Sequence, residues 1–302
     1  MSDPNPFQPA TAIPKRLKAF FYGAPGVGKT ILSLHFPGVT LIDLERGTDH
    51  YGGQFTFSKL PTVSIDEITA AVKWLHENQH DYRTLVIDPL TVYWDMVQTK
   101  WAGIFGRKAN PKDKNAGDAY TFDPKDHKPM KDDFRKFLRL LADLDMNVIG
   151  TAHEKDEYSE TQFMSKVGKT FDCEKHAGHF FDVLGRIYIG PKGARMIHVL
   201  KDRTNALPKE DFPADFSQVE ACLGKDKLEA KAVPVPAAPV FIRATQEHQD
   251  EFRALAAKAG YTGPTALADA KKAMGLPTSP LSDENAAKAI ETLKGVTAEK
   301  AS

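Results

Sequence analysis

A lysine and a threonine close a glycine-rich segment near the start of the chain, and these residue types at this spacing can bind phosphate. The segment reads G-A-P-G-V-G-K-T over residues 23–30, between an aromatic, strand-like run and the start of a helical pattern. It matches G-x-x-x-x-G-K-[ST] in the strand-then-helix context that forms a phosphate-binding loop. The glycines let successive backbone N–H groups face an anion, and the helix N-terminus adds partial positive charge. The residues predicted to bind the nucleotide are Gly23, Ala24, Pro25, Gly26, Val27, Gly28, Lys29, Thr30 and Ile31.

Lys29 and Thr30 have distinct predicted tasks within this segment. We expect Lys29 to reach the outer phosphates of a nucleoside triphosphate and the Thr30 hydroxyl to ligate Mg²⁺. A second magnesium ligand is predicted at Asp88, which directly follows the apolar run 84–87. A buried parallel strand that ends in an aspartate delivers a carboxylate to the metal beside the nucleotide. The sequence therefore predicts a nucleoside triphosphate site that uses Mg²⁺.

Two further polar residues, Glu45 and His153, follow strand-like runs. In a parallel α/β sheet, ligands bind outside the carboxyl ends of the strands, so both side chains should lie near the phosphates. Hydrolysis needs a group that orients or deprotonates the attacking water, and the position after Asp88 is Pro89, which cannot do so. Glu45 is therefore the predicted water-activating residue, with an ion pair to a surface lysine as the alternative. His153 is expected either to sense the γ-phosphate or to cap the end of its strand.

Two cations, Lys201 and Arg203, follow a later strand-like run over residues 194–200. They lie on the far side of the predicted domain. We expect them to reach the γ-phosphate of a neighbouring subunit as trans-acting fingers, since a cation supplied in this way stabilises the charge of phosphoryl transfer. The alternative is a pair of solvated charges after a strand, which contributes little.

Cysteine and histidine residues raise the question of a metal site. Cys173 and Cys222 are far apart in the sequence and imply no disulfide framework, which suits a reducing compartment. Cys173, His176 and His179 are zinc-ligand types, but their spacing matches no standard finger and no fourth ligand is nearby. The sequence leaves open whether these three residues bind a metal.

The overall composition excludes a general affinity for polyanions. Of the 302 residues, 41% are apolar and 26% are charged, and the formal net charge is zero. No global field attracts the protein to nucleic acid or to a membrane surface, so such binding would need local patches. The sequence shows no apolar run of membrane-spanning length and no signal-peptide pattern at residues 1–14. We expect a cytoplasmic protein without a membrane partner.

Strand-like and helix-like patterns alternate over residues 15–208, which predicts an α/β core with a mostly parallel sheet flanked by helices. Residues 1–14 are rich in proline and predict a flexible arm. Residues 209–240 lose periodicity and end in a proline-rich stretch, which predicts a linker. Residues 241–302 contain amphipathic helical patterns and predict a small all-α module at the low end of what folds alone.

Two long polar segments, 107–136 and 154–179, interrupt the predicted core and are predicted to be loops. The first holds more Lys and Arg than Asp and Glu, with Tyr120 and Phe122 interleaved. Cations that follow phosphates, combined with aromatic rings that stack on bases, are what proteins use to bind single strands. A solvated loop is the alternative, because six aspartates dilute the charge of the segment.

Taken in order, these motifs over residues 15–207 resemble the RecA-like branch of P-loop ATPases. The chain looks closest to the small phage-encoded RecA-like proteins that assist single-strand annealing and homologous recombination. The resemblance implies a RecA-like core and ATP as the nucleotide. It also implies that segments 107–131 and 154–179 line a central DNA path. The second segment lacks the glycine-rich character of its RecA counterpart. This difference argues against strand exchange more than against DNA binding.

The same resemblance implies roles for individual residues. Glu45 matches the glutamate that activates water, and His153 stands where RecA has a glutamine that senses the γ-phosphate. Lys201 and Arg203 match two lysines that act across the subunit interface, with arginine replacing the second lysine. These implied roles agree with those inferred from the strand ends.

The resulting prediction is an ATP-dependent, DNA-binding, RecA-like protein that promotes single-strand annealing or homologous recombination of phage DNA. It would bind single-stranded DNA, form a homo-oligomeric ring or filament, and act in the cytoplasm of a bacterial host. We expect residues 241–302 to dock a partner such as a single-strand-binding protein, or else to act only as a solubilising tail. Two alternatives stay open: a ring-type DNA motor or helicase, and a nucleotide-gated loader that acts through residues 241–302.

Overall fold

The chain divides into two compact units, residues 1–236 and 237–302, and each is described by itself. The computed structural model describes residues 16–113, 115, 117–118, 120–159, 165–233, 246–261, 266–274, 286 and 289–294. The predicted arm over residues 1–14 therefore lies outside the described residues, as does the proline-rich end of the predicted linker.

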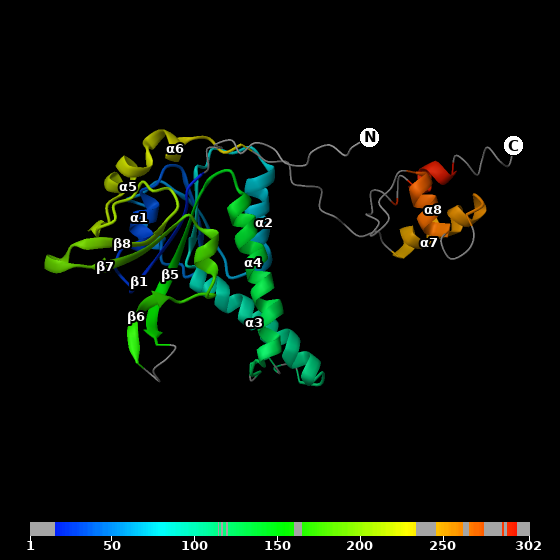
Figure 1. The fold of residues 1–302 in the computed structure, drawn as a ribbon, viewed down its shortest axis with the longest axis horizontal. Helices are drawn as coiled ribbons and strands as arrows, with labels where there is room; N and C mark the ends of the chain where they lie inside the picture. Colours follow the sequence, from blue (N-terminus) through cyan, green and yellow to red (C-terminus); the bar gives the residue numbers. More distant parts are fainter. Residues whose placement is uncertain are drawn as a thin grey trace, which may run out of the picture. The chain divides into compact units, whose positions relative to one another are not determined.

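A mixed, mostly parallel sheet forms the centre of the first unit (Figure 1). Its strands are β1 (Lys18–Gly23), β2 (Val39–Asp43), β3 (Ser58–Pro61), β4 (Thr84–Asp88), β5 (Asn147–Tyr158), β6 (Lys166–Phe171), β7 (Val183–Ile189), β8 (Arg195–Asp202) and β9 (Phe212–Pro213). The order across the sheet is β3-β2-β4-β5-β1-β7-β8-β9, and β6 pairs with β5 off this path. Strands β3 through β7 in this order are parallel to their neighbours, whereas β8, β9 and β6 pair antiparallel. The prediction of a mostly parallel sheet is confirmed.

This sheet has two edges that matter for function. We call the edge where the parallel strands end the carboxyl edge, and the edge where they begin the amino edge. In a parallel α/β sheet, ligands bind beyond the carboxyl edge. Because β8 runs antiparallel to β7, its first residue, Arg195, lies at the carboxyl edge and its last residue, Asp202, lies at the amino edge.

Helices cover both faces of the sheet. They are α1 (Lys29–Leu34), α2 (Ile65–Glu77), α3 (Leu90–Ala109), α4 (His127–Asp143), α5 (Phe216–Leu223) and α6 (Lys225–Glu229), with 3-10 turns η1 (Asp49–Tyr51), η2 (Pro124–Asp126), η3 (Ala177–Phe180) and η4 (Pro191–Gly193). Figure 1 shows α2, α3 and α4 on one side of the sheet and α1, α5 and α6 on the other. Successive residues of β1 point to opposite faces of the sheet. Phe20 packs in the core formed with α2, α3 and α4, and Phe21 packs in the core formed with α1, α5 and α6. A strand with both faces covered is buried along its whole length, as β1 is.

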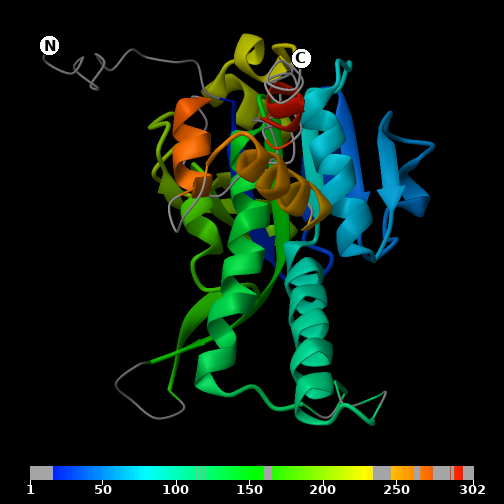
Figure 2. The ribbon, with the colours of Figure 1, turned by 90° about the vertical axis from the view of Figure 1, so that its right-hand side faces the viewer.

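The two long segments predicted as loops are more regular than expected. Helix α3 continues to Ala109 and α4 begins at His127, so the irregular connection is much shorter than the predicted 107–136. The segment 154–179 was predicted to be a loop, but part of it is regular. Strand β5 continues to Tyr158 and forms an antiparallel hairpin with β6. Figure 2 shows α3, α4 and the β5–β6 hairpin extending beyond the sheet in the same direction.

The predicted linker over residues 209–240 is wrong for its first part. Residues 212–229 form β9, α5 and α6, and Val219, Leu223 and Leu228 are buried in the core beside α1. The lack of a long periodic pattern in the sequence has a simple cause, since three short elements each offer only one or two core residues. The first unit therefore includes chain that the sequence assigned to a connection.

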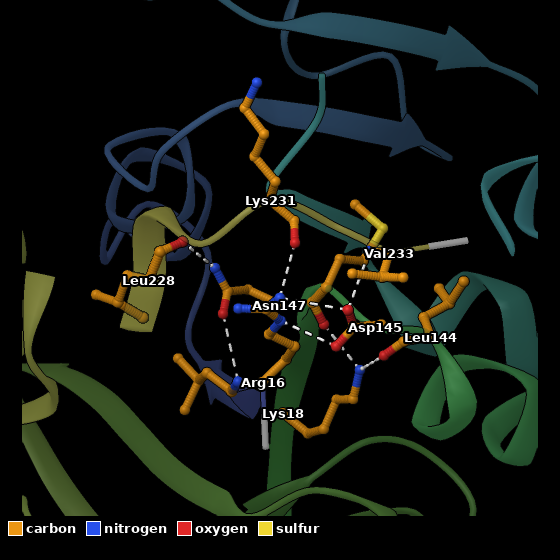
Figure 3. A network of polar contacts seen from close by, with 10 residues as sticks. Arg16, Lys18, Leu144, Asp145, Asn147, Leu228, Lys231 and Val233 are labelled. Carbon is orange, nitrogen blue, oxygen red and sulfur yellow. Dashed lines mark hydrogen bonds and ion pairs between the residues drawn. The ribbon is translucent and has the colours of Figure 1, made fainter. Parts of the chain in front are cut away.

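The amino edge is held together by buried polar contacts (Figure 3). The Lys18 ammonium donates to the carbonyls of Leu144 (2.6 Å) and Met146 (2.8 Å). The Asn147 amide donates to the carbonyl of Leu228 (2.8 Å), which ties α6 to the start of β5. Buried polar groups of this kind must be paired, and here the backbone supplies most of the partners. These contacts fix the strands whose other ends build the site.

The second unit is helical in its described parts. It contains α7 (Gln246–Lys258), α8 (Ala266–Ala273) and helical residues at 286 and 289–294. Phe252, Ala256, Ala270, Ile290 and Leu293 form its small buried core. Across the part of the chain that the structure describes, no helix has both the length and the apolar character needed to cross a bilayer.

Candidate nucleotide-binding site

The predicted phosphate-binding loop lies at the carboxyl edge, between β1 and α1. Gly26 and Gly28 have φ angles of 78° and 99°, a left-handed conformation that favours glycine. Gly23 has a different reason to be glycine, because a Cβ there would lie 2.2 Å from the carbonyl oxygen of Ile187 on β7. The three glycines of the motif are thus required by backbone conformation at two positions and by close strand packing at the third.

Lys29 lies over this loop. Its ammonium donates to the carbonyls of Gly23 (2.8 Å) and Ala24 (3.0 Å), which belong to the loop itself. Burial lowers the pKa of Lys29 below its ordinary value, while the carboxylates of Asp88 and Glu45 act in the opposite direction. A phosphate placed in the loop would offer this ammonium charged acceptors in place of neutral carbonyls, and hydrogen bonds to charged groups are the stronger ones.

Thr30 and Asp88 lie together, as the sequence predicted. The Thr30 hydroxyl donates to Asp88 Oδ2 at 2.6 Å, and the Thr151 hydroxyl of β5 donates to Asp88 Oδ1. A hydroxyl and a carboxylate that converge beside the lysine of a phosphate loop fit Mg²⁺, which takes oxygen ligands from the protein and from substrate phosphates. Thr151 was missed by sequence reasoning, and its position two residues before His153 on the same strand was the available signal.

Glu45 and His153 also meet at this edge. Their side chains lie 3.1 Å apart, from His153 Nε2 to Glu45 Oε1, and both are partly exposed. Glu45 is positioned by a tight connection after β2, where the buried Asp43 carboxylate accepts hydrogen bonds from the backbone N–H groups of Gly47 (3.2 Å) and Thr48 (3.3 Å). His153 lies opposite Gly23 in the β1–β5 register. The water-activating and sensing candidates therefore lie beside the phosphate loop and contact each other.

Lys201 and Arg203 lie elsewhere, at the amino edge. The Lys201 ammonium donates to the carbonyls of Gly178 (2.7 Å) and Phe181, and its pKa is lowered by burial and then by the neighbouring Arg203. Arg203 lies 3.7 Å from Asp182 with about half of its side chain exposed. Neither contacts the phosphate loop of its own chain, so their action across a subunit interface stays a prediction. Of the two, Arg203 is the more accessible.

Arg195 was missed by sequence reasoning and lies beside the loop. A Cβ placed on Gly28 would be 3.1 Å from both Cδ and Nε of Arg195. The signal was present in the sequence, because a turn, Gly190-Pro191-Lys192-Gly193, joins two strand-like runs. Such a turn makes a hairpin and returns the second strand to the edge where the first one ended.

The surroundings of Cys173 and His176 bear on the question of a zinc site. The Cys173 thiol is buried against the carbonyl of Leu90, and burial raises its pKa. His176 Nδ1 lies 2.9 Å from the Arg135 guanidinium and 3.2 Å from the Glu174 carboxylate. Within the described ranges, no group of three or more histidine, cysteine or acidic side chains is arranged to hold a metal ion. Cys173 belongs to the core and His176 to an ion-pair network, whereas His179 is exposed and its ring contacts that of His176.

Comparison with known proteins agrees with this geometry. No curated protein matches the chain in a sequence search. A protein-family model described as "AAA domain" matches residues 15–206, which is more than half of the chain and covers all of the strands that pair in parallel. The chain therefore belongs to this AAA domain family of P-loop ATPase-like proteins.

Proposed function

We propose that this protein hydrolyses ATP at the carboxyl edge and uses the cycle to control binding of single-stranded DNA. The observation that carries the ATPase proposal is the convergence of five side chains at this edge. Lys29 lies on the phosphate loop, Asp88 and Thr30 contact each other beside it, and Glu45 lies within 3.1 Å of His153 at the same edge. Phosphoryl transfer depends mostly on positioning and charge stabilisation, and these groups supply both.

The proposed reaction needs one proton acceptor. A water molecule attacks the γ-phosphorus, the bond to the β–γ bridging oxygen breaks, and ADP and inorganic phosphate leave. Glu45 takes the proton of the attacking water, a role for which a partly exposed carboxylate at the carboxyl edge is suited. Thr30 and Asp88 would hold Mg²⁺, whose charge offsets that of the phosphates when it is bound.

His153 gives the site a way to respond to the γ-phosphate. Its Nε2 contacts Glu45, and its backbone N–H donates to the Thr91 hydroxyl at the start of α3 (2.9 Å). A γ-phosphate bound in the loop would offer His153 a second charged acceptor, and we propose that His153 turns to it and releases Glu45 to the water. Beyond His153, β5 runs directly into the hairpin with β6, which supports a connection between the nucleotide and the part of the first unit that extends beyond the sheet.

The proposed DNA surface is the α3–α4 tip, which we define as the described residues within the range 107–131. Its exposed cations include Arg107, Lys108, Lys112 and Lys128. The β5–β6 hairpin is a weaker candidate, because two of its lysines, Lys166 and Lys169, are paired with Asp156 (2.6 and 2.7 Å). Cations without such pairing are better placed to neutralise phosphates.

Aromatic side chains at the tip are partly engaged with each other. Tyr120 lies between Phe105 and Phe122, with ring centroids 5.8 and 5.6 Å away, and its hydroxyl donates to Asp126 (2.7 Å). Base stacking at this tip would therefore use the outer faces of this cluster. Annealing or recombination, assembly into a ring or filament, and docking of a single-strand-binding protein by residues 241–302 remain parts of the proposal.

Steady-state ATP hydrolysis with and without single-stranded DNA tests this proposal. We expect single strands to stimulate hydrolysis more than duplex, and to do so less at moderate than at low salt, because phosphate contacts weaken as salt rises. Replacing Lys108 and Lys112 by alanine should reduce the stimulation while leaving DNA-free hydrolysis unchanged. The matched control is the same change at Lys225 and Lys227, which are exposed on α6.

The outcomes distinguish the alternatives. No response to either form of DNA would contradict the DNA proposal and favour a loader that acts through residues 241–302. Directional unwinding of a tailed duplex would favour a motor.

A further inference from the structure

We infer that Arg195 binds the nucleotide of its own subunit. Its side chain holds the inner phosphates, which ADP and ATP share. This inference rests on the proposed function. It extends the site to β8, which lies outside the phosphate-loop motif of residues 23–30. Arg195 begins β8, pairs with Ile189 of β7, and lies at the carboxyl edge.

The side chain of Arg195 lies directly over the last glycine of the phosphate loop. A Cβ at Gly28 would lie 3.1 Å from Cδ and Nε and 3.5 Å from Cζ, so the whole outer half of the arginine side chain passes this residue. Gly28 immediately precedes Lys29, in the part of the loop whose backbone N–H groups face phosphate. An anion in the loop would therefore lie within reach of the guanidinium.

The backbone of Arg195 is fixed while its charge is free. Its carbonyl accepts a hydrogen bond from Ala214 at 2.8 Å, and β7 pairs with it on the other side. The side chain is exposed, and within the described part of the chain no carboxylate or carbonyl is bonded to its guanidinium. This contrasts with Arg186 on the adjacent strand, whose Nε donates to Glu154 (3.0 Å). A rigidly placed arginine without a partner beside a phosphate loop is suited to bidentate phosphate recognition.

Strand order decides which phosphates Arg195 meets. Of the residues expected at the γ-phosphate, Glu45 follows β2, Asp88 ends β4, and His153 is the last residue of β5 that pairs with β1. Strands β2, β4 and β5 all lie on one side of β1. Strand β8 lies on the other side of β1, beyond β7. A nucleotide whose outermost phosphate lies toward Asp88 extends its inner phosphates and its nucleoside toward β7 and β8. Arg195 therefore faces groups that ADP and ATP have in common.

Nucleotide binding by Arg195→Ala, measured calorimetrically with ADP and with a non-hydrolysable ATP analogue, tests the inference. Loss of charge-assisted hydrogen bonds should weaken both ligands about tenfold and by similar factors. The rate at saturating ATP should change by less than about twofold, because the interaction is the same before and during the reaction. Arg195→Lys should recover only part of the affinity, since an ammonium lacks the planar fork.

The control is Arg139→Ala, which removes an exposed arginine from α4 and should bind both nucleotides like the wild type. Unchanged affinity of Arg195→Ala, in a wild-type protein that binds nucleotide, would overturn this inference alone. So would a lowered rate at saturating ATP with unchanged ADP affinity, because that pattern indicates a residue acting on the γ-phosphate. A wild-type protein that binds neither ligand would overturn the proposed function as well.

Discussion

Lys18 begins β1, Lys29 begins the helix α1 that follows the other end of β1, and the two lysines make nearly the same contacts. Each donates to two backbone carbonyls, Lys18 to Leu144 and Met146 and Lys29 to two residues of its own loop. Burial lowers the pKa of both ammonium groups. Local bonding and burial therefore do not distinguish a structural lysine from a functional one.

The difference lies in what surrounds each lysine. At the amino edge, Lys18 and Asn147 are bonded to carbonyls of other elements and are closed off from solvent. At the carboxyl edge, Asp88 and Thr30 contact each other, and Glu45 contacts His153 with both side chains partly exposed. Side chains that are bonded to one another, rather than to fixed backbone, can exchange these partners for a ligand.

A cavity is also a poor guide to which edge is the site. A cavity of about 410 Å³ lies at the amino edge, lined by side chains that include Lys18, Asp145, Asp182 and Arg203. Its charges are of both signs and are largely paired, with Arg203 3.7 Å from Asp182 and Asp145 bonded to Arg16 (3.0 Å). Compensated charges of this kind offer little to a phosphate, whereas the carboxyl edge has Arg195, whose guanidinium has no bonded carboxylate or carbonyl among the described residues.

Replacing Lys29 should reduce ATP binding and hydrolysis more than any other change considered. A small effect would contradict the distinction between the two edges of the sheet. Lys29→Ala removes charge-assisted hydrogen bonds to the outer phosphates, each worth about 1.5–3 kcal/mol. We expect affinity for ATP to fall by about a hundredfold or more, with hydrolysis falling below detection. Binding is measured by titration calorimetry and turnover by release of inorganic phosphate.

The resistance of Lys29→Ala to urea unfolding tests whether Lys29, unlike Lys18, serves nucleotide binding more than it serves the fold. Of its two carbonyl partners, Ala24 is partly exposed and Gly23 is buried at the end of β1, so the midpoint of urea unfolding should fall only modestly below that of the wild type. ATP affinity within tenfold of the wild type, in a variant that folds, would contradict the assignment of this edge.

Replacing Glu45 should give the next largest effect, and only on the reaction. Glu45→Gln keeps the size of the side chain and removes its basicity, so turnover should fall about a hundredfold while ATP affinity stays unchanged. Single-turnover kinetics with saturating ATP measures the chemical step. Asp49→Asn, an exposed carboxylate on the same connection, serves as the control. Near-normal turnover in Glu45→Gln would remove Glu45 from the catalytic role.

Sequence reasoning predicted what depends on local pattern. The phosphate loop, Asp88 at the end of its strand, and Glu45 and His153 at the carboxyl edge all follow from short motifs and from the geometry of parallel sheets. His153 was predicted to end its strand, but β5 continues to Tyr158 and His153 is the last residue that pairs with β1. The α/β core follows from alternating periodicities. These features need no knowledge of which distant segments pair.

What was missed depends on pairing between distant residues. The hairpin of β5 with β6 converts a polar, apparently irregular segment into regular structure, because backbone bonds rather than apolar periodicity hold it. Segment 212–229 joins the core through single residues such as Leu228. Arg195 gains its position only because β8 runs antiparallel to β7, which also places Lys201 at the opposite edge.

The smallest predicted effect concerns Lys18 and is a dependence of stability on pH. Burial lowers the pKa of Lys18 to about 7, against 10.5 for an exposed lysine. Between these values the unfolded chain binds more protons than the folded one, so the free energy of unfolding should rise with pH as the folded state avoids a buried charge. Below pH 7 both states hold the proton and the contribution is constant. The neutral amine still has two hydrogens for its two carbonyl acceptors.

Lys18→Met removes this dependence while filling a similar volume. The difference in unfolding free energy between the wild type and Lys18→Met should therefore grow by about 1 kcal/mol per pH unit between pH 7 and 9. Urea unfolding at pH 7, 8 and 9 measures it, with Lys73→Met, an exposed lysine of α2, as the control that should show no such growth. A constant difference across this range would mean that Lys18 keeps its charge when buried. The two lysines would then differ in their electrostatics as well as in their surroundings, because only a charged Lys18 would need the carboxylates of Asp145 and Asp182 nearby.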